Sequence, residues 1–422
     1  MSFFDTSTPH ISNLLHFPKM LKKLFSILFI LCLPLCAVGQ KKDIAAARDL
    51  VKSGRDLSKA EDMMAKLLKD SVNLHNEKIW TVLFDAVKKQ YDAGNEQLYL
   101  KNKYDTAQLF LNARKMFLIY EAYDSIEAVP GKNGAVVAKN RKKHADFLMP
   151  YRKNLYTGGQ FFLHKKEFAR AYDMLDTYLG CMSHPLFSSH SIASADRHLS
   201  NAAYLALYSG YKLGDAGKTL KFKELAMADT ANMNNKYQYL AETYLTMKDT
   251  ASYVSTMEEG FGKYPLSMYY FPRLFDYYFN IRRNFAKADA LCAAALHSDS
   301  TNMVFLLAKS SLELENDDYD GCISICDKLI MRSDTLADAY LNAGLAYYNQ
   351  AIKAGGDATL ARRNRDKLRS LYKSALPYLQ RYRELSPSAQ DRWAYPLYTI
   401  YLNLNMGKEF EEVEKLLKQG GK

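Results

Sequence analysis

The fold is decided by two stretches of sequence, ADAYLNAGLAYYNQ (residues 337–350) and LYKSALPYLQRYRELSPS (residues 371–388). In both stretches small residues recur beside large apolar ones at helical spacing, which predicts two helices that each bury one face. Gly344 lies inside the first stretch, where glycine costs about 1 kcal/mol of helix propensity relative to alanine. We therefore expect Gly344 to let a neighbouring helix approach closely, and we predict that the two stretches form a packed pair.

The same pattern recurs upstream with a period of 34 residues. At each step a small or medium residue is followed by one of similar size, and an aromatic residue by an aromatic one, as a stacked repeat requires for its packing surface. The equivalent positions are Phe285 and Tyr319, Ala288 and Cys322, Cys292 and Cys326, Ala295 and Leu329, and Met303 and Ala337.

The unit that begins at Ala337 resembles the tetratricopeptide repeat, a pair of antiparallel helices with defined packing positions. Large, small and aromatic residues occupy those positions, namely Tyr340, Ala343, Gly344, Tyr347, Ala375, Leu379, Tyr382 and Pro387. Units of the same type are expected over 155–178, 237–265 and 275–295, and weaker matches extend toward both ends of the chain.

The resemblance implies an all-α fold, a right-handed α-solenoid (superhelix) of antiparallel helix pairs. We expect a single array over 43–422, strongest over 150–387, with a helix-extending insertion over 351–370. The composition agrees, because 20 Gly and 11 Pro in 422 residues are too few for an all-β fold with its many turns.

Residues 1–39 have the pattern of a secretory signal peptide. Lys22 and Lys23 precede an apolar stretch over 24–36, which is shorter than the roughly 20 residues of a membrane-spanning helix. We expect translation to begin at Met20, so that residues 1–19 are a mis-assigned upstream start, and we expect cleavage between Gly39 and Gln40. A retained anchor is the alternative. The protein is thus predicted to be an exported bacterial member of the family, periplasmic or associated with the outer membrane.

Catalytic and metal-binding motifs were sought, and the sequence predicts neither an enzyme nor a cofactor. No HExxH, GxSxG or GxGxxG motif occurs. One long connection gathers side chains of metal-ligand type, but their spacings match none of the close pairs that zinc sites use. These residues are Cys181, His184, His190, Asp196 and His198. A chance cluster is the preferred interpretation, and an enzyme that uses this loop is the weaker alternative.

Two basic stretches carry much of the net charge of +11, which falls to +9 when residues 1–39 and their three lysines and one aspartate are removed. The insertion over 351–370 could bind an acidic partner or an anionic polymer of the cell envelope, or it could be a solvated helix tip. The run over 139–144 is expected to be a solvated helix face. Nucleic-acid binding is disfavoured, because no groove-reading helix or stacked aromatic motif is present.

The resemblance further implies a concave groove lined by the first helix of each pair. The positions offset from the packing residues are Tyr156, Gln160, Gln238, Glu242, Arg273, Tyr277, Leu341, Leu345 and Tyr348. This mixed, tyrosine-rich set suits side chains of a protein or peptide. We therefore predict a non-enzymatic scaffold that binds a protein or peptide partner in the cell envelope. The alternative is a glycan-binding protein, and membrane association is expected only through the signal sequence or a partner.

Overall fold

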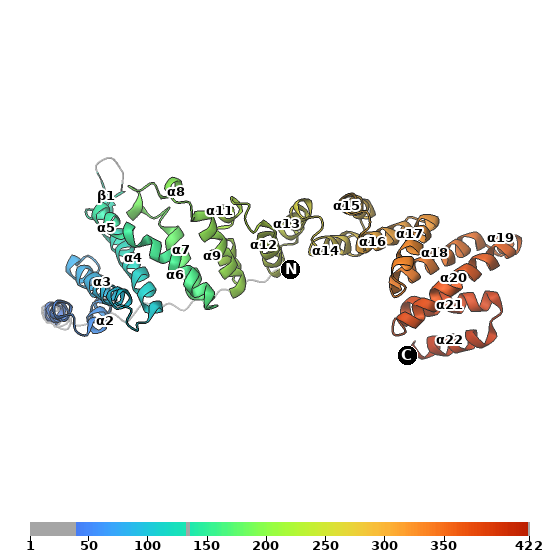
Figure 1. Ribbon diagram of the computed structural model, residues 1–422, viewed down its shortest axis with the longest axis horizontal. Helices are drawn as coiled ribbons and strands as arrows, with labels where there is room; N and C mark the ends of the chain where they lie inside the picture. Colours follow the sequence, from blue (N-terminus) through green and yellow to red (C-terminus); the bar gives the residue numbers. More distant parts are fainter. Residues whose placement is uncertain (1–38, 132–135, 421–422) are drawn as a thin grey trace, which may run out of the picture. The chain divides into compact units, whose positions relative to one another are not determined.

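The computed structural model describes residues 39–131 and 136–420, which fall into two compact units, Met1–Ala231 and Asn232–Lys422. Both units are built almost entirely of helices joined by short turns (Figure 1). The fold is an all-α solenoid of helix pairs, as the sequence predicts. One unbroken array across the two units stays a prediction.

The first unit begins with a helix over 39–53 and continues through a series of packed helices. Its longer helices are α2 (Leu57–Leu67), α3 (Glu77–Tyr99), α4 (Thr106–Glu127), α5 (Arg141–Leu148), α6 (Arg152–His164), α7 (Phe168–Gly180) and α9 (Leu199–Leu213). The short helices are η1 (Ser71–Asn73), η2 (Met149–Tyr151), η3 (Pro185–Phe187), α8 (Ile192–Ala195), α10 (Ala216–Leu220) and α11 (Lys223–Met227). Strands β1 (Val129–Pro130) and β2 (Val136–Val137) form a small antiparallel ladder.

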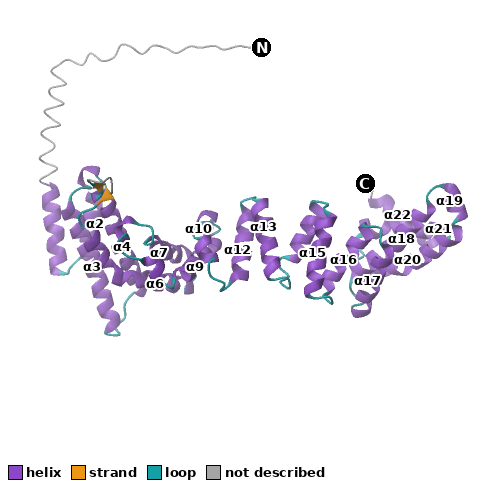
Figure 2. Ribbon diagram, turned by 90° about the horizontal axis from the view of Figure 1, so that it is seen from above, coloured by secondary structure: helices purple, strands orange, loops and turns teal. Residues whose placement is uncertain are grey.

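The second unit is more regular, because most of its helices alternate in pairs of similar length (Figure 2). They are α12 (Met233–Thr246), α13 (Thr250–Lys263), α14 (Phe271–Asp276) with the π-helical turn η4 (Tyr277–Ile281), α15 (Phe285–Ser298), α16 (Met303–Glu315), α17 (Tyr319–Arg332), α18 (Ala337–Gly355), α19 (Ala358–Arg363), α20 (Arg365–Leu385), α21 (Gln390–Leu404) and α22 (Gly407–Gly420). Pro272 lies in the first turn of α14, where its missing N–H leaves no hydrogen bond unmade.

Helices contact mainly the elements that precede and follow them in the chain. In the first unit α3 packs on α4, α6 on α7 and α7 on α9, and in the second unit α16 packs on α17, α18 on α20 and α20 on α21. Side chains cap many of the starts, and at α4 the Asp105 carboxylate accepts hydrogen bonds from the backbone N–H groups of Ala107 and Gln108. Short connections thus place successive helices side by side, and side-chain caps stabilise the starts of several of them.

The packing positions expected from the repeat pattern are buried. Ala343, Ala375 and Leu379 are fully buried, and a Cβ atom placed on Gly344 would lie 2.6 Å from Cγ of Leu379. That distance is shorter than any real contact between carbon atoms, so the absence of a side chain at Gly344 is what lets α18 and α20 pack. The expected close approach at this glycine is confirmed.

Two long helices flank the segment 351–370. α18 has 19 residues and α20 has 21, and α19 lies between them. The Asp357 carboxylate caps α19 by accepting from the backbone N–H groups of Thr359 and Leu360 at 2.8 and 2.9 Å.

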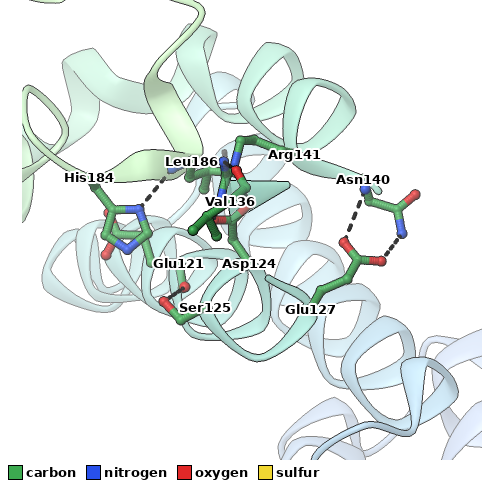
Figure 3. A network of polar contacts seen from close by, with 9 residues as sticks. All are labelled: Glu121, Asp124, Ser125, Glu127, Val136, Asn140, Arg141, His184 and Leu186. Carbon is green, nitrogen blue, oxygen red and sulfur yellow. Dashed lines mark hydrogen bonds and ion pairs between the residues drawn. The ribbon is translucent and has the colours of Figure 1, made fainter. Parts of the chain in front are cut away.

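The run over 139–144 is only partly solvated, which corrects the expectation from its charge. Arg141 turns toward α4, and its guanidinium donates to both oxygens of the Asp124 carboxylate, which is 2% exposed (Figure 3). It also donates to the carbonyl oxygen of Val136, while the Asn140 amide donates to Glu127. One face of α5 packs on α4, so a basic residue on that face is turned away from solvent and pairs with an acidic residue of α4.

The predicted signal peptide and its cleavage site lie almost entirely in residues 1–38, outside the described residues, and its fate stays a prediction. Within the described ranges the longest helices are too polar to span a membrane.

Candidate functional site

Four of the predicted groove residues come from adjacent helices of the second unit. Gln238 and Glu242 lie one turn apart on α12, while Arg273 lies on α14 and Tyr277 begins η4. Gln238, Glu242 and Tyr277 are half-buried, and Arg273 is exposed.

Tyr269, just before α14, connects α12 with α14. Its hydroxyl donates to Oε1 of Glu242 at 2.7 Å, and its carbonyl oxygen accepts from Nη1 of Arg273 at 2.8 Å. The Arg273 guanidinium carbon lies 4.2 Å from the centre of the Tyr269 ring, within cation–π range. We call Glu242, Tyr269 and Arg273 the α12–α14 cluster.

The electrostatics of this cluster keep the phenol neutral. Burial raises the pKa of Tyr269 strongly, and its hydrogen bond to the Glu242 carboxylate raises it further. Tyr269 therefore stays a hydrogen-bond donor through the physiological pH range. The cluster offers a carboxylate, a guanidinium and an aromatic ring, a combination that recognises polar and charged groups.

Tyr156 and Gln160 lie on α6 in the first unit, and the structure brings them together. The Gln160 amide donates to the Tyr156 hydroxyl at 3.2 Å, and that hydroxyl donates to the Asn201 side chain at 2.9 Å. The Tyr156 ring also stacks on His198, with 5.1 Å between the ring centres. The contacts of Tyr156 are thus already made with α9 and the loop before it.

A buried ion pair lies behind Tyr156, and the sequence pattern did not reveal it. The Arg152 guanidinium pairs with the Asp196 carboxylate, which also accepts from the Tyr178 hydroxyl. Burial opposes ionisation of Asp196, but hydrogen bonds from Tyr178 and Arg152 outweigh it and hold the pKa of this carboxyl below its ordinary value. This pair fastens the 181–198 connection to α6 and α7.

The other ligand-type side chains of that connection have separate structural partners. Cys181 is buried and donates to the carbonyl oxygen of Thr177, His184 accepts from the backbone N–H of Leu186, and His190 lies 3.3 Å from Asp146. Within the described ranges, no group of three or more His, Cys, Asp or Glu side chains is placed to hold a metal ion.

The last three predicted groove positions lie on α18 and mostly serve packing. Leu341 is 1% exposed and Tyr348 is 9% exposed, and both belong to the apolar core formed with α20 and α21. Leu345 is half-buried against the same core. The sequence prediction chose groove residues only by their offset from the packing positions. It could not anticipate that α21 packs on α18 and covers this face. Leu341 and Tyr348 are therefore core residues.

These observations decide the type of architecture, since helix pairs with buried small residues at the expected positions recur through both units. The chain folds as a series of packed helix pairs, the all-α architecture that the resemblance to the tetratricopeptide repeat implies.

Comparisons with known proteins add little to this description of the fold. A solved structure described as the TPR domain of P58(IPK) is 12% identical, with 91% of this chain and 99% of that chain covered and a TM-score of 0.26. A score this low carries no argument. No family model and no curated protein matches the chain.

Tyr269 is the functional candidate that sequence reasoning missed. It lies in the connection between α13 and α14, 34 residues before Met303, so the period reaches its position. The period indicates packing at such a position, however, and carries no signal for the polar contacts of the Tyr269 hydroxyl with Glu242.

Proposed function

We propose that this protein is a non-enzymatic repeat scaffold that binds a protein or peptide partner. The α12–α14 cluster is the observation that carries the proposal. It places a carboxylate, a phenol and an exposed guanidinium on adjacent helices of one unit, held in fixed geometry by hydrogen bonds of 2.7 and 2.8 Å. Preorganised polar side chains lose little entropy on binding, which favours recognition.

The cluster suits a peptide segment with an acidic group. Nη1 of Arg273 donates to the Tyr269 carbonyl oxygen, and because the side chain is exposed, its other guanidinium N–H groups are accessible to a ligand. An arginine of this kind can bind a carboxylate through two parallel hydrogen bonds. The half-buried Gln238 and Tyr277 border the cluster and would supply amide and aromatic contacts.

Export to a bacterial cell envelope is part of the same proposal. Its support is the sequence over 20–39, with a basic start, an apolar stretch and small residues before Gln40. Mass spectrometry of the N-terminus of the protein recovered from an envelope fraction tests it, and a chain that begins at Gln40 is the expected result. Recovery of an uncleaved chain from the cytosol would refute export.

Crosslinking followed by affinity capture and mass spectrometry tests the binding function. Arg273→Glu reverses the charge of the cluster, and we expect it to lose partners that the wild type retains. Lys328→Glu is the matched control, because Lys328 is exposed on α17 and the charge change is the same.

The outcomes separate the candidate functions. Equal loss in Arg273→Glu and Lys328→Glu would show a general charge effect and would count against the cluster. Binding of glycans on an array without any protein partner would replace the scaffold by the glycan-binding alternative.

A further inference from the structure

The helix-extending insertion forms one wall of a hollow within the second unit. The hollow has a volume of about 440 Å³ and lies between α19, α20 and the end of α21. Pockets for small organic ligands begin at roughly 300 Å³. Figure 1 shows α19 beside α20 at the far end of the chain, with α21 packed next to α20.

Three arginines line the hollow, and no carboxylate does. Arg362 comes from α19, whereas Arg365 and Arg369 lie one turn apart on α20 and share a face. Arg362 and Arg369 form no ion pair with any described residue. Arg365 lies 4.0 Å from Asp366, and both side chains are more than four-fifths exposed, so the pair is weak.

Other basic residues of the second unit do have acidic partners. Lys353 pairs with Asp317 at 3.1 Å, and Arg392 pairs with Asp338 at 2.8 Å. The three arginines therefore leave a concentrated positive charge in one concave place. Guanidinium groups bind phosphate oxygens through paired hydrogen bonds, and several of them together suit a group with more than one negative charge.

Contacts at the tip hold the walls of the hollow in place. The Asn364 side chain donates to the carbonyl oxygen of Ala354 at 2.9 Å, which ties the junction of α19 and α20 to the end of α18. Leu368 and Tyr372 supply apolar surface on α20, and Tyr372 is only 5% exposed.

The far side of the hollow carries two carboxamides. Asn403 and Asn405 line it from the end of α21, and Asn405 has a left-handed backbone conformation with φ of 58°. Nδ2 of Asn403 donates one N–H to the carbonyl oxygen of Thr399 at 2.8 Å, which leaves its second N–H for a ligand. A carboxamide can donate to an oxyanion without adding charge. The arrangement thus combines three cations, two amides and an apolar floor.

We propose that this hollow binds a phosphate monoester, with the phosphate between the arginines and its organic group against Leu368 and Tyr372. A monoester carries close to two negative charges at neutral pH, which matches the cationic wall better than a singly charged carboxylate. The site is separate from the α12–α14 cluster, so it stands or fails independently of the scaffold function.

The first test measures binding of phenyl phosphate to the full chain by saturation-transfer NMR titration, at low and at moderate salt. We expect saturable binding that weakens with salt, and weaker binding of inorganic phosphate, which cannot contact the apolar floor. Absence of saturable phenyl phosphate binding would overturn the proposal. Equal affinity for phenyl phosphate and inorganic phosphate would overturn the role of Leu368 and Tyr372.

The second test uses matched variants. Loss of one charge-assisted contact in Arg365→Gln or Arg369→Gln should lower the affinity about tenfold. Arg363→Gln is the control, because Arg363 is exposed on the same short helix as Arg362 but does not line the hollow. If Arg363→Gln lowers the affinity for phenyl phosphate as much as the other two variants do, binding depends only on the overall charge, and the proposed site is refuted.

A third comparison identifies the form of the phosphate. Methyl phenyl phosphate, a diester with one negative charge, should bind about tenfold more weakly than the monoester, because it offers one fewer anionic oxygen. If the diester binds as tightly as the monoester, the proposed preference for a monoester is wrong, and the phosphodiester groups of a polymer become the better candidate ligand. Asn405→Gly, which keeps the left-handed backbone and removes the amide, should weaken binding without unfolding the protein.

Discussion

Replacement of Glu121 by glutamine should change the pH dependence of the stability of the first unit. Glu121 lies on α4, and burial raises the pKa of its carboxyl from 4.5 to about 7; Arg114 lowers the value and Asp176 raises it, each less than burial does. The folded state therefore holds this proton more tightly than the unfolded state does. The contribution of the Glu121 carboxyl to the free energy of unfolding is therefore fully present below about pH 4.5, and it is lost as the pH rises through about 7.

The size of the effect follows from the two pKa values. A difference between 4.5 and about 7 corresponds to about 3 kcal/mol in the free energy of unfolding, lost between pH 4 and pH 8. Glutamine has a similar shape and no charge to bury. Glu121→Gln should thus unfold at higher urea than the wild type at pH 8, and the two should converge near pH 4.

The two tryptophans make the assay specific for each unit. Trp80 belongs to the first unit and stacks on Tyr123 of α4, with 5.5 Å between the ring centres. Trp393 belongs to the second unit, and its buried indole N–H has no hydrogen-bond partner, so Trp393→Phe is a mild change. Urea unfolding followed by Trp80 fluorescence in that background reports the first unit alone.

A clear result would refute the reasoning. The measured quantity is the urea concentration at the midpoint of unfolding, followed by Trp80 fluorescence. If this midpoint falls as steeply between pH 4 and pH 8 in Glu121→Gln as in the parent, burial of the Glu121 carboxyl does not cause the pH dependence. The Trp393 transition, followed in a Trp80→Phe background, is the control and should be unaffected by Glu121→Gln.

Asp124→Ala should lower the stability of the first unit by about 3 kcal/mol, because it leaves the Arg141 guanidinium, 17% exposed, without its carboxylate; an unchanged Trp80 transition would contradict this. Gly344→Ala should cost the second unit about 1–3 kcal/mol, because the new methyl group would lie 2.6 Å from Cγ of Leu379. Gly262→Ala on α13 is its control, since no other side chain or remote backbone atom lies within 4 Å of a Cβ there, and it should be neutral or stabilising by up to about 1 kcal/mol. If Gly344→Ala and Gly262→Ala unfold at the same urea concentration, as followed by Trp393 fluorescence, close packing at Gly344 does not contribute to the stability of the second unit.

Much of the fold could be predicted because packing between helix pairs constrains residue size at fixed intervals. Gly344 and Leu379 show this directly, since one must lack a side chain for the other to fit. The 34-residue period does not constrain residues that lie outside the repeats. The small strands β1 and β2 lie in the connection between α4 and α5 of the first unit, and Arg141 contacts Asp124 across that connection, so only the structure reveals them.

The candidate site was less predictable, because exposure depends on what the next pair covers. Gln238 and Glu242 are half-buried and Arg273 is exposed, and their place in a groove stays a prediction, whereas Leu341, chosen by the same offset from the packing residues, is buried in the core with α20 and α21. Whether a residue of a first helix is exposed depends on which later helices pack on it. Those contacts involve residues far along the chain, and the sequence of a single repeat does not specify them.

Contacts between neighbouring helices also bear on how the chain reaches its native state. α6 packs mainly on α4, α7 and α9, and α20 packs mainly on α18 and α21, so most contacts join segments that are close in the sequence. Folding is fast when contacts are local, and it can begin in any pair and spread to the next. A chain that emerges with its N-terminus first, from a ribosome or a translocation channel, can therefore fold pair by pair before its C-terminus appears.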